Sequence, residues 1–272
     1  EVGEDGSLPE MDEDGSQSFV FTFCMTGADT PNPEEDIKAW YPDFDSFYQQ
    51  QVSSGDYNIA THGWESVWTY RRLYKEGPAN VNPNDVSMMN WFKGNDYLKG
   101  TLYKTKAETQ AEVDAGDWRG GVNIDDIAAA EKDAVGFYFF MKNERTPSWD
   151  TRYLHGGDAM NMMDTKHGLS KFPYIRGTRR VIGLNNFRLT QRYFVEADPG
   201  VTTTCYRFYD SVGIGCYAVD VHPTEISDGM SGDYHTPAPF YIPYRALGSA
   251  NVRNLLAAGK TLATTFFTNA GY

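Results

Sequence analysis

One long segment, residues 123–144, sets the first constraint on the fold. Its sequence is NIDDIAAAEKDAVGFYFFMKNE. Asn123 can cap a helix there, and Asp125 and Asp126 fall in the first turn, where the helix dipole favours acids. Apolar residues then recur at helical spacing: Ile124, Ile127, Ala128, Ala134, Val135, Tyr138 and Phe139. The pattern predicts a helix that packs into the core.

Most other patterned segments predict strands. SFVFTFCM (18–25) is rich in β-branched and aromatic residues. After about residue 165 the chain predicts strands separated by turn residues, at 179–190, 202–210, 211–222 and 239–247. Residues 254–259, NLLAAG, form a short apolar run, which is typical of a parallel strand buried on both faces. With a short helix near 43–52 and a loop over 78–100, an α/β fold is predicted.

Composition excludes some classes of protein. The net charge is −13, whereas a nucleic-acid-binding protein normally presents a basic face, so no nucleic-acid partner is expected. No apolar run approaches the roughly 18 residues of a membrane span, so none is predicted. Aromatic residues make up 15% of the chain, which suits either a pocket for a flat ligand or a sugar-binding surface. The compartment stays open, with a secreted or periplasmic location slightly favoured.

The cysteines and the N-terminus add little about function. Cys24, Cys205 and Cys216 are odd in number and form no CxxC, so free buried thiols are favoured over a pair between Cys205 and Cys216. Residues 1–16 are predicted to be an acidic flexible segment. They mimic the start of a calcium loop, but Phe21 stands where the closing Glu is required. The start EVGEDGSLPE is not a signal peptide and suggests a processed end or a fragment.

The sequence AAGKT (257–261) first suggests a nucleotide-binding P-loop. That motif requires a glycine five residues before Gly259, and Asn254 stands there, so an NTPase is rejected. What remains is a strand that ends at Gly259, followed by helix amides at 260–263 that suit an anion or a polarised carbonyl. A plain strand–turn–helix is the alternative.

DVHPTE (220–225) ends a predicted strand. Asp220 and His222 would share one face there, opposite Val219 and Val221. An Asp beside a His can fix its tautomer and raise its basicity, which suits proton removal from a substrate. Two alternatives stay open. One is a structural, hydrogen-bonded histidine, and the other is a metal site drawn from His222, Glu225, Asp228 and His235.

Two further segments carry candidate binding groups. Arg176, Arg179 and Arg180 lie within five residues of an acidic chain, where they suit carboxylates, phosphates or flat rings but equally salt bridges. FYIPYRAL (240–247) places Tyr241, Tyr244 and Arg245 around a proline, either as a pocket wall or as edge-strand packing. No G-x-S-x-G and no G-x-G-x-x-G occurs, and the GIG at 213–215 lies inside a strand pattern.

The order of these motifs resembles one family. HGLSKFPYIRGTRRVIGLNNFRLT, FYDSVGIGCYAVDVHP, FYIPYRAL and NVRNLLAAGKTLATTFFTNAGY are together similar to FAD-dependent oxidoreductases of the glutathione-reductase-like flavoproteins, of which some bacterial members carry a xanthan-lyase-like label. SQSFVFTFCMT and WRGGVNIDDIAAAEKDA extend the resemblance toward the N-terminus. It implies FAD as cofactor. Residues 254–259 correspond to the last strand of the FAD domain, Gly259, Lys260 and Thr261 to the turn that faces the cofactor, and 268–272, with Asn269, to the approach to the flavin ring.

The chain departs from that family at both ends. The N-terminal βαβ unit, whose glycine fingerprint binds the FAD pyrophosphate, is absent, and so is the basic, His-Pro-containing stretch that follows in family members. The resemblance therefore implies the interior of a larger flavoprotein: a substrate domain at 17–238 and an incomplete part of the FAD domain at 239–272. The missing FAD-binding segment or a second chain is the expected partner.

The resemblance and the local chemistry together predict hydride transfer from a small-molecule substrate to FAD. His222, oriented by Asp220, is the expected base. Arg179 is assigned to the cofactor, and Arg180, Arg245, Tyr241 and Tyr244 are assigned to the substrate. A non-catalytic glycan-binding or structural component that retains a flavoprotein-like fold is the alternative. A metal-dependent hydrolase is a third hypothesis.

Overall fold

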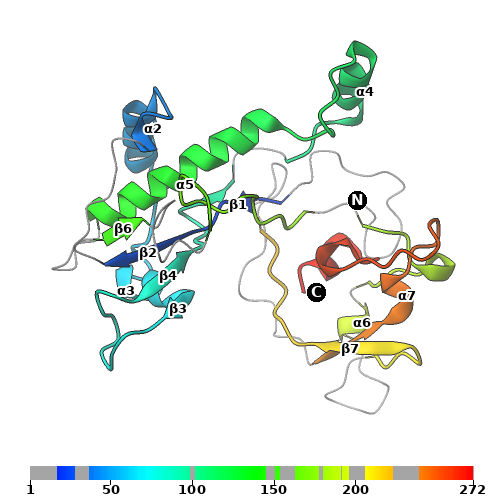
Figure 1. Cartoon of the computed structure of the whole chain (residues 1–272). Helices are drawn as coiled ribbons and strands as arrows, with labels where there is room; N and C mark the ends of the chain where they lie inside the picture. Colours follow the sequence, from blue (N-terminus) through cyan, green and yellow to red (C-terminus); the bar gives the residue numbers. More distant parts are fainter. Residues whose placement is uncertain are drawn as a thin grey trace. The chain divides into compact units, whose positions relative to one another are not determined.

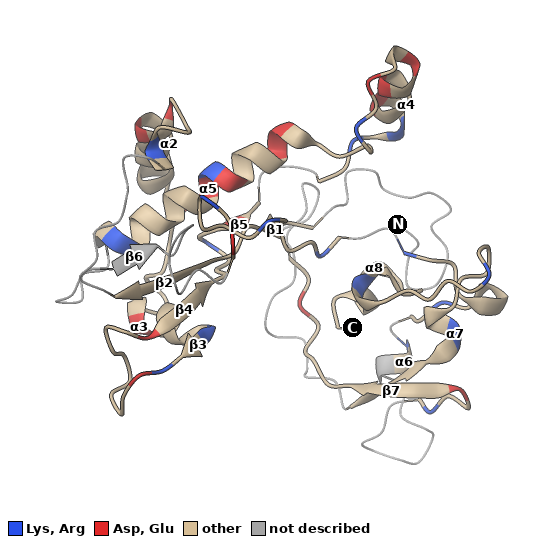
Figure 2. Ribbon diagram, viewed as in Figure 1, with Lys and Arg blue, Asp and Glu red and all other residues tan. Residues whose placement is uncertain are grey.

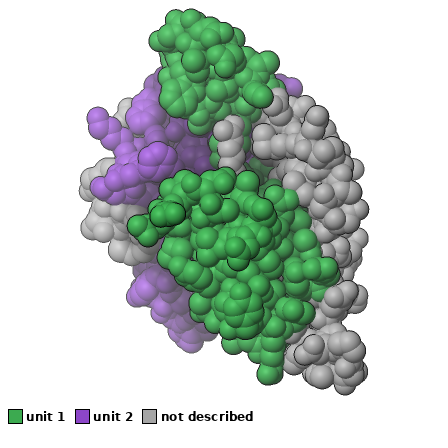
Figure 3. Space-filling model, turned by 90° about the vertical axis from the view of Figure 1, so that its right-hand side faces the viewer, with its two compact units in different colours: residues 1–18, 103–122, 176–272 green, residues 19–102, 123–175 purple. Residues whose placement is uncertain are grey.

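The computed structural model describes residues 17–27, 37–98, 102–144, 151–153, 163–177, 180–190, 192–195, 206–222 and 239–271 (Figure 1). The chain forms two compact units (Figure 3). Unit 1 comprises Glu1–Ser18, Tyr103–Val122 and Arg176–Tyr272, and unit 2 comprises Phe19–Leu102 and Asn123–Ile175. Helices and small sheets together fit the predicted α/β class. The domain boundaries predicted at residues 16 and 238 rest on family resemblance rather than on contacts, and they stay a prediction. Residues 1–16 lie outside the described part of the chain.

Unit 2 is built on an antiparallel sheet with the strand order β3-β4-β2-β6. The fully buried strand β2 (Phe23–Gly27) pairs with β4 (Val86–Met89) on one side and with β6 (Thr151–Tyr153) on the other. Strand β3 (Arg72–Tyr74) pairs with β4. A separate pair joins β1 (Phe19–Val20) to β5 (Asp96–Tyr97). The strand predicted at 18–25 is thus confirmed, as two strands. The loop predicted over 78–100 is wrong, because β4 and β5 are short and gain their pairing only from distant strands.

Helix α5 (Ile124–Glu144) confirms the long helix predicted from the sequence. Asn123 and Asp126 cap it reciprocally, with an amide N–H bond of 3.4 Å and a side-chain bond of 2.7 Å. Nearly all its side chains from residue 134 to 141 are buried, so this half is apolar all round, as expected for a central core helix. Gly136 lets the Tyr57 hydroxyl cross the helix, since a Cβ there would stand 2.1 Å from that oxygen.

Two shorter helices complete unit 2. Helix α2 (Phe44–Ser54) packs against α5 and confirms the helix predicted near 43–52. Helix α3 (Trp64–Tyr70) packs against β4 and buries Val67 and Trp68. Both helices lie beside these partners in Figure 1. The core of this unit is therefore one sheet with α3 against it and α5 packed between sheet strands and α2.

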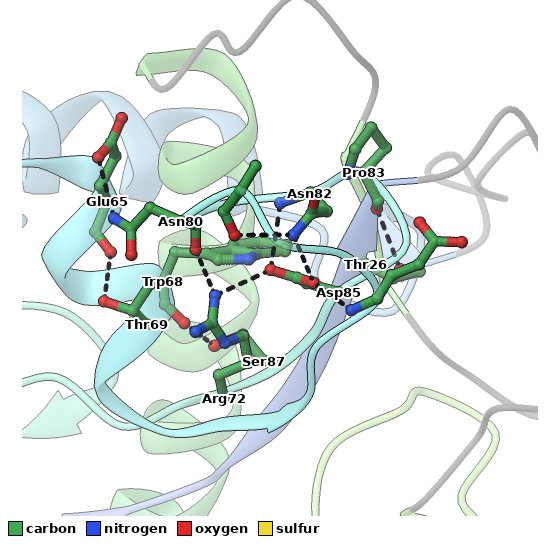
Figure 4. A network of polar contacts seen from close by, with 12 residues as sticks. Thr26, Glu65, Trp68, Thr69, Arg72, Asn80, Asn82, Pro83, Asp85 and Ser87 are labelled. Carbon is green, nitrogen blue, oxygen red and sulfur yellow. Dashed lines mark hydrogen bonds and ion pairs between the residues drawn. The ribbon is translucent and has the colours of Figure 1, made fainter.

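A buried carboxylate organises the loop between β3 and β4 (Figure 4). Asp85, which is fully buried, accepts hydrogen bonds from the backbone N–H of Glu76 at 2.8 Å and of Asn82 at 3.1 Å. The Arg72 guanidinium donates to it at 3.0 Å and also donates to the Asn80 carbonyl. Burial acts to raise the pKa of Asp85, but these donors outweigh it and hold the pKa below its usual value. The loop therefore closes around an ionised side chain.

Unit 1 contains one pair of antiparallel strands, β7 (Ser211–Gly215) and β8 (Phe240–Pro243), within its described part. Short helical segments surround them: η1 (Leu184–Asn186), α6 (Arg192–Val195), α7 (Tyr244–Leu247), η2 (Gly259–Thr261) and α8 (Phe266–Asn269). Leu189, Phe208, Ala246, Leu262 and Ala263 form its buried core cluster. Helix α4 (Lys106–Ala115) begins with a Thr105–Glu108 capping box and buries none of its side chains, and it carries both signs of charge (Figure 2).

Several predicted strands of unit 1 are wrong or shorter than expected. Residues 180–190 hold η1 and isolated bridges, and the described residues 206–210 form no strand. The segment 211–222 is a strand only as far as Gly215, and 239–247 turns into α7 after Pro243. The GIG motif does lie within a paired strand, as its pattern predicted. Backbone bonds here join distant residues one at a time instead of forming ladders, as in Val181 to Thr261 and Leu189 to Ala263, both at 2.9 Å.

The buried strand predicted at 254–259 is also wrong. Leu255 and Leu256 are 46% and 56% exposed, and Asn254 has a positive φ of 59° that breaks an extended run. The buried extended segment lies further along, at residues 262–265. There, Leu189 donates to the Ala263 carbonyl and accepts from Thr265, each at 2.9 Å. The apolar run therefore marks the approach to the buried segment rather than the segment itself.

Two of the cysteines are free thiols. Cys24 is buried, as predicted, and burial raises its pKa to about 11, so the thiol stays protonated. Cys216 is exposed, and Cys205 lies outside the described residues. Among the described helices, none combines the length and apolarity that a membrane crossing requires.

Candidate functional site

The Asp220–His222 pair lies on the segment that follows β7. Val219 and Val221 are buried against Ala270, and the two polar side chains take the other face, as the alternation predicted. The Nε2 atom of His222 lies 3.1 Å from Oδ2 of Asp220, within hydrogen-bond distance. The His222 side chain is only 12% exposed. The pair is thus formed locally and held by the apolar residues between its members.

The charge state of Asp220 fixes the tautomer of His222. The hydrogen bond from His222 is the largest influence that lowers the pKa of Asp220, and the charges of Arg176 and Lys260 lower it further against the opposing effect of burial. The carboxylate is therefore ionised near neutral pH and accepts the Nε2 proton. In the neutral ring, the lone pair then resides on Nδ1.

Distant segments of unit 1 hold this pair in place. The His222 backbone N–H donates to the side chain of buried Gln17 at 3.0 Å, and the Asp220 N–H donates to the Ala270 carbonyl at 3.4 Å. Arg176, also buried, donates to the Ser18 carbonyl at 3.0 Å. Residues 17–18, 176, 219–222 and 260–270 are therefore brought together by long-range contacts.

Lys260 and Asn269 are joined by two reciprocal bonds. The Lys260 ammonium donates to the Asn269 carbonyl, and the Asn269 amide donates to the Lys260 carbonyl, each at 2.8 Å. Burial, and then the charge of Arg176, lower the pKa of Lys260 against the opposing effect of Asp220. Asn269 is fully buried, and its Oδ1 has no hydrogen-bond partner among the described residues. A half-buried ammonium is thus bonded to the backbone of a residue whose own Oδ1 finds no donor among the described residues.

The helix start predicted after Gly259 is not present. Gly259 does turn the chain, at a left-handed φ of 68° with no atom within 4 Å of a Cβ position. The three-residue turn η2 follows, and α8 begins only at Phe266. The Ala263 amide donates to the Ala246 carbonyl at 2.9 Å, and the Thr261 hydroxyl donates to the Ala258 carbonyl at 3.1 Å. The predicted row of outward helix amides at 260–263 is therefore wrong.

A different part of unit 1 holds Tyr241, Tyr244 and Arg245, and two of these residues contact Asp210. The Tyr244 and Arg245 backbone N–H groups both bond to Asp210, and the Arg245 guanidinium lies 3.5 Å from its carboxylate. That guanidinium also lies over the rings of Phe187, Phe208 and Tyr209 at 4.4–5.3 Å. Tyr241 packs against the core cluster, and Tyr244 is exposed. These contacts lie at Asp210 and its neighbouring rings, and a role of this group in substrate binding stays a prediction.

The remaining predicted residues are partly outside the described chain. Arg180 is half-buried, whereas Arg179, Glu225, Asp228 and His235 lie outside the described residues. Within the residues that are described, no group of three His, Cys, Asp or Glu side chains could hold a metal ion. Gln17 is a contributor that the sequence did not indicate, and Arg176 was a candidate binding group without an assigned role. Their burial depends on tertiary contacts, which residue type and spacing do not reveal.

Comparison with known proteins gives one family. The model of a family described as FAD dependent oxidoreductase matches residues 6–272. Searches of curated proteins and of solved structures gave no match. The matched region includes every segment that contributes to the Asp220–His222 and Lys260–Asn269 contacts.

Proposed function

This chain belongs to the FAD-dependent oxidoreductase family. We propose that His222 accepts the proton that a small-molecule substrate releases when the bound flavin oxidises it. The family establishes FAD as the cofactor and a flavin-dependent oxidoreductase role. We propose further that Lys260 and Asn269 hold the flavin ring. The observation that carries the proposal is the hydrogen-bonded pair of ionised Asp220 and His222, whose carboxylate lies within electrostatic range of half-buried Lys260.

The donor set of this cluster fits a flavin. The buried Oδ1 of Asn269 accepts no hydrogen bond from the described part of the chain, and a buried acceptor of this kind calls for a partner such as a ring N–H. Lys260 contributes a positive charge of the kind that stabilises a reduced flavin on its N1 side. FAD, when bound, supplies the acceptor for the hydride that leaves the substrate.

The protein residues then divide the remaining work. Asp220 holds the imidazole through Nε2, so that Nδ1 of His222 is the atom that accepts the proton. The ionised Asp220 stabilises the imidazolium that results. Lys260, because it is desolvated, acts on nearby charge more strongly than a solvated lysine would.

Further residues are proposed to bind the substrate and the rest of the cofactor. Arg180, Arg245, Tyr241 and Tyr244 are proposed for the substrate, and Arg179 for the flavin. The sequence contains no G-x-G-x-x-G, so we place the pyrophosphate cradle on another segment or chain. That arrangement corresponds to a glutathione-reductase-like flavoprotein, which we propose as the finer fold.

A donor screen tests this proposal. The protein is purified from its natural source, its flavin is released by denaturation and identified, and the native protein is then mixed anaerobically with alcohols, amines, sugars and hydroxy acids. We expect FAD to be released and at least one donor to bleach the visible flavin absorbance. Protein that carries no flavin, or a flavin that no donor reduces, would contradict the proposal and favour a binding or structural role.

A further inference from the structure

A second cluster of polar and aromatic side chains lies in unit 2. It contains none of the residues assigned to the flavin. Glu131 lies on α5, His167 lies in the segment 163–177, and Trp40 lies in a turn whose N–H donates to the Ile37 carbonyl. The His167 Nε2 atom is 4.0 Å from Glu131 Oε1, and the His167 ring meets the Trp40 ring at 5.6 Å and 69°.

The backbone fixes the tautomer of His167. The Leu169 N–H donates to His167 Nδ1 at 3.0 Å, so Nδ1 is an acceptor and the proton of the neutral ring is on Nε2. Burial lowers the pKa of His167, which favours this neutral form. The Nε2–H donor therefore lies on the side of Glu131.

Glu131 is an acceptor that the described residues do not satisfy. Its side chain is two-thirds buried, yet its carboxylate accepts no hydrogen bond from any described residue. Burial raises the pKa of Glu131, and the charge of Glu131 in turn helps to raise the pKa of Tyr41. The 4.0 Å separation from His167 is too long for a direct hydrogen bond.

One hydroxyl oxygen satisfies both groups. An oxygen about 2.8 Å from each atom, the usual hydrogen-bond length, can stand beside a 4.0 Å gap, accept from His167 and donate to Glu131. An ammonium group would meet the His167 donor unfavourably, and an anion would meet the Glu131 charge. The pair therefore selects a neutral group that both donates and accepts.

Trp40 supplies an apolar surface next to that position. Its side chain is 49% exposed, although it lies against His167. A flat indole suits the C–H face of a ring whose hydroxyl reaches the polar pair. We propose that Trp40, Glu131 and His167 form a binding subsite for a neutral polyhydroxylated ring, that is, a hexose.

Calorimetric titration tests this subsite on the FAD-containing protein. The probes are D-glucose, D-galactose and D-mannose, with choline and inorganic phosphate as the cationic and anionic comparisons. We expect at least one hexose to bind with a dissociation constant of about 1 mM, as befits a few weak contacts, and to bind more tightly than choline or phosphate. No hexose binding, or tighter binding of either ion, would overturn the proposal.

Matched variants locate the binding. Glu131→Gln keeps the side-chain size, and His167→Asn keeps an acceptor for the Leu169 amide while it removes the Nε2 donor. These two variants and Trp40→Ala should each weaken hexose binding at least tenfold. Trp118→Ala, at another exposed tryptophan, should leave binding unchanged. Unchanged binding in the first three folded variants, or an equal loss in Trp118→Ala, would contradict the assignment.

Discussion

Replacement of His222 by alanine is expected to slow reduction of the bound flavin by substrate roughly 100- to 10,000-fold, the usual contribution of a general base. The measurement is anaerobic stopped-flow bleaching of the flavin with the donor identified by screening. In the wild type the rate should rise with pH as the imidazole loses its proton, and this rise should be absent from the variant. The backbone N–H of residue 222 keeps its bond to Gln17, so the segment is expected to stay in place.

A matched histidine distinguishes this role from a general effect on the protein. His62 is exposed and lies in unit 2, and His62→Ala should reduce its flavin at the wild-type rate and with the wild-type pH profile. Asp220→Asn should slow the reaction as well, because an amide no longer requires the Nε2–H tautomer. A His222→Ala protein that retains both the rate and the pH profile would remove His222 from the mechanism.

Replacement of Asp85 by asparagine is expected to destabilise the β3–β4 loop by about 1.5–3 kcal/mol, the range for hydrogen bonds to a charged group. Asparagine keeps the shape of the side chain, but its NH₂ group faces the donors of Glu76, Asn82 and Arg72. Hydrogen exchange of the segment 75–85 measures the loss locally, and each 1.4 kcal/mol should accelerate exchange about tenfold wherever the loop opens reversibly.

The contribution of Asp85 to the stability of the loop should depend on pH. The folded pKa of Asp85 lies below its ordinary value, so its contribution is present above the unfolded pKa of about 3.9 and is lost as pH falls through the folded pKa. The difference between wild type and Asp85→Asn should therefore shrink in acid. Exposed Asp117→Asn serves as the control and should change neither exchange nor its pH dependence. Equal protection in all three proteins at neutral pH would contradict the role assigned to Asp85.

The parts of the fold that sequence predicted are those with a local cause. Helix α5 has a cap, a first turn of acids and a long apolar pattern, and the Asp220–His222 contact follows from alternation over three residues. Strand β4 is only four residues long and depends on its pairing with β2. The buried strand was predicted at 254–259, but the buried residues are 262–265, because these are the ones that bond to Leu189.

The candidate site shows the same division. Lys260 and Asn269 were assigned to the cofactor from family resemblance, and the structure shows that the two residues are hydrogen-bonded to each other. Arg176 was noted only as one of three arginines, since nothing local distinguishes it from Arg180. Its place near Asp220 and Lys260 depends on the burial of its side chain against Ser18.

The reduction potential of the bound FAD tests the central claim that the Lys260 cluster lies at the flavin. Lys260→Met should lower the potential by roughly 30 mV or more, which for a two-electron couple corresponds to about 1.4 kcal/mol of lost stabilisation. Lys260→Arg should retain most of the wild-type value, and exposed Lys75→Met should match the wild type. An FAD-loaded, folded Lys260→Met protein with an unchanged potential would place the flavin elsewhere.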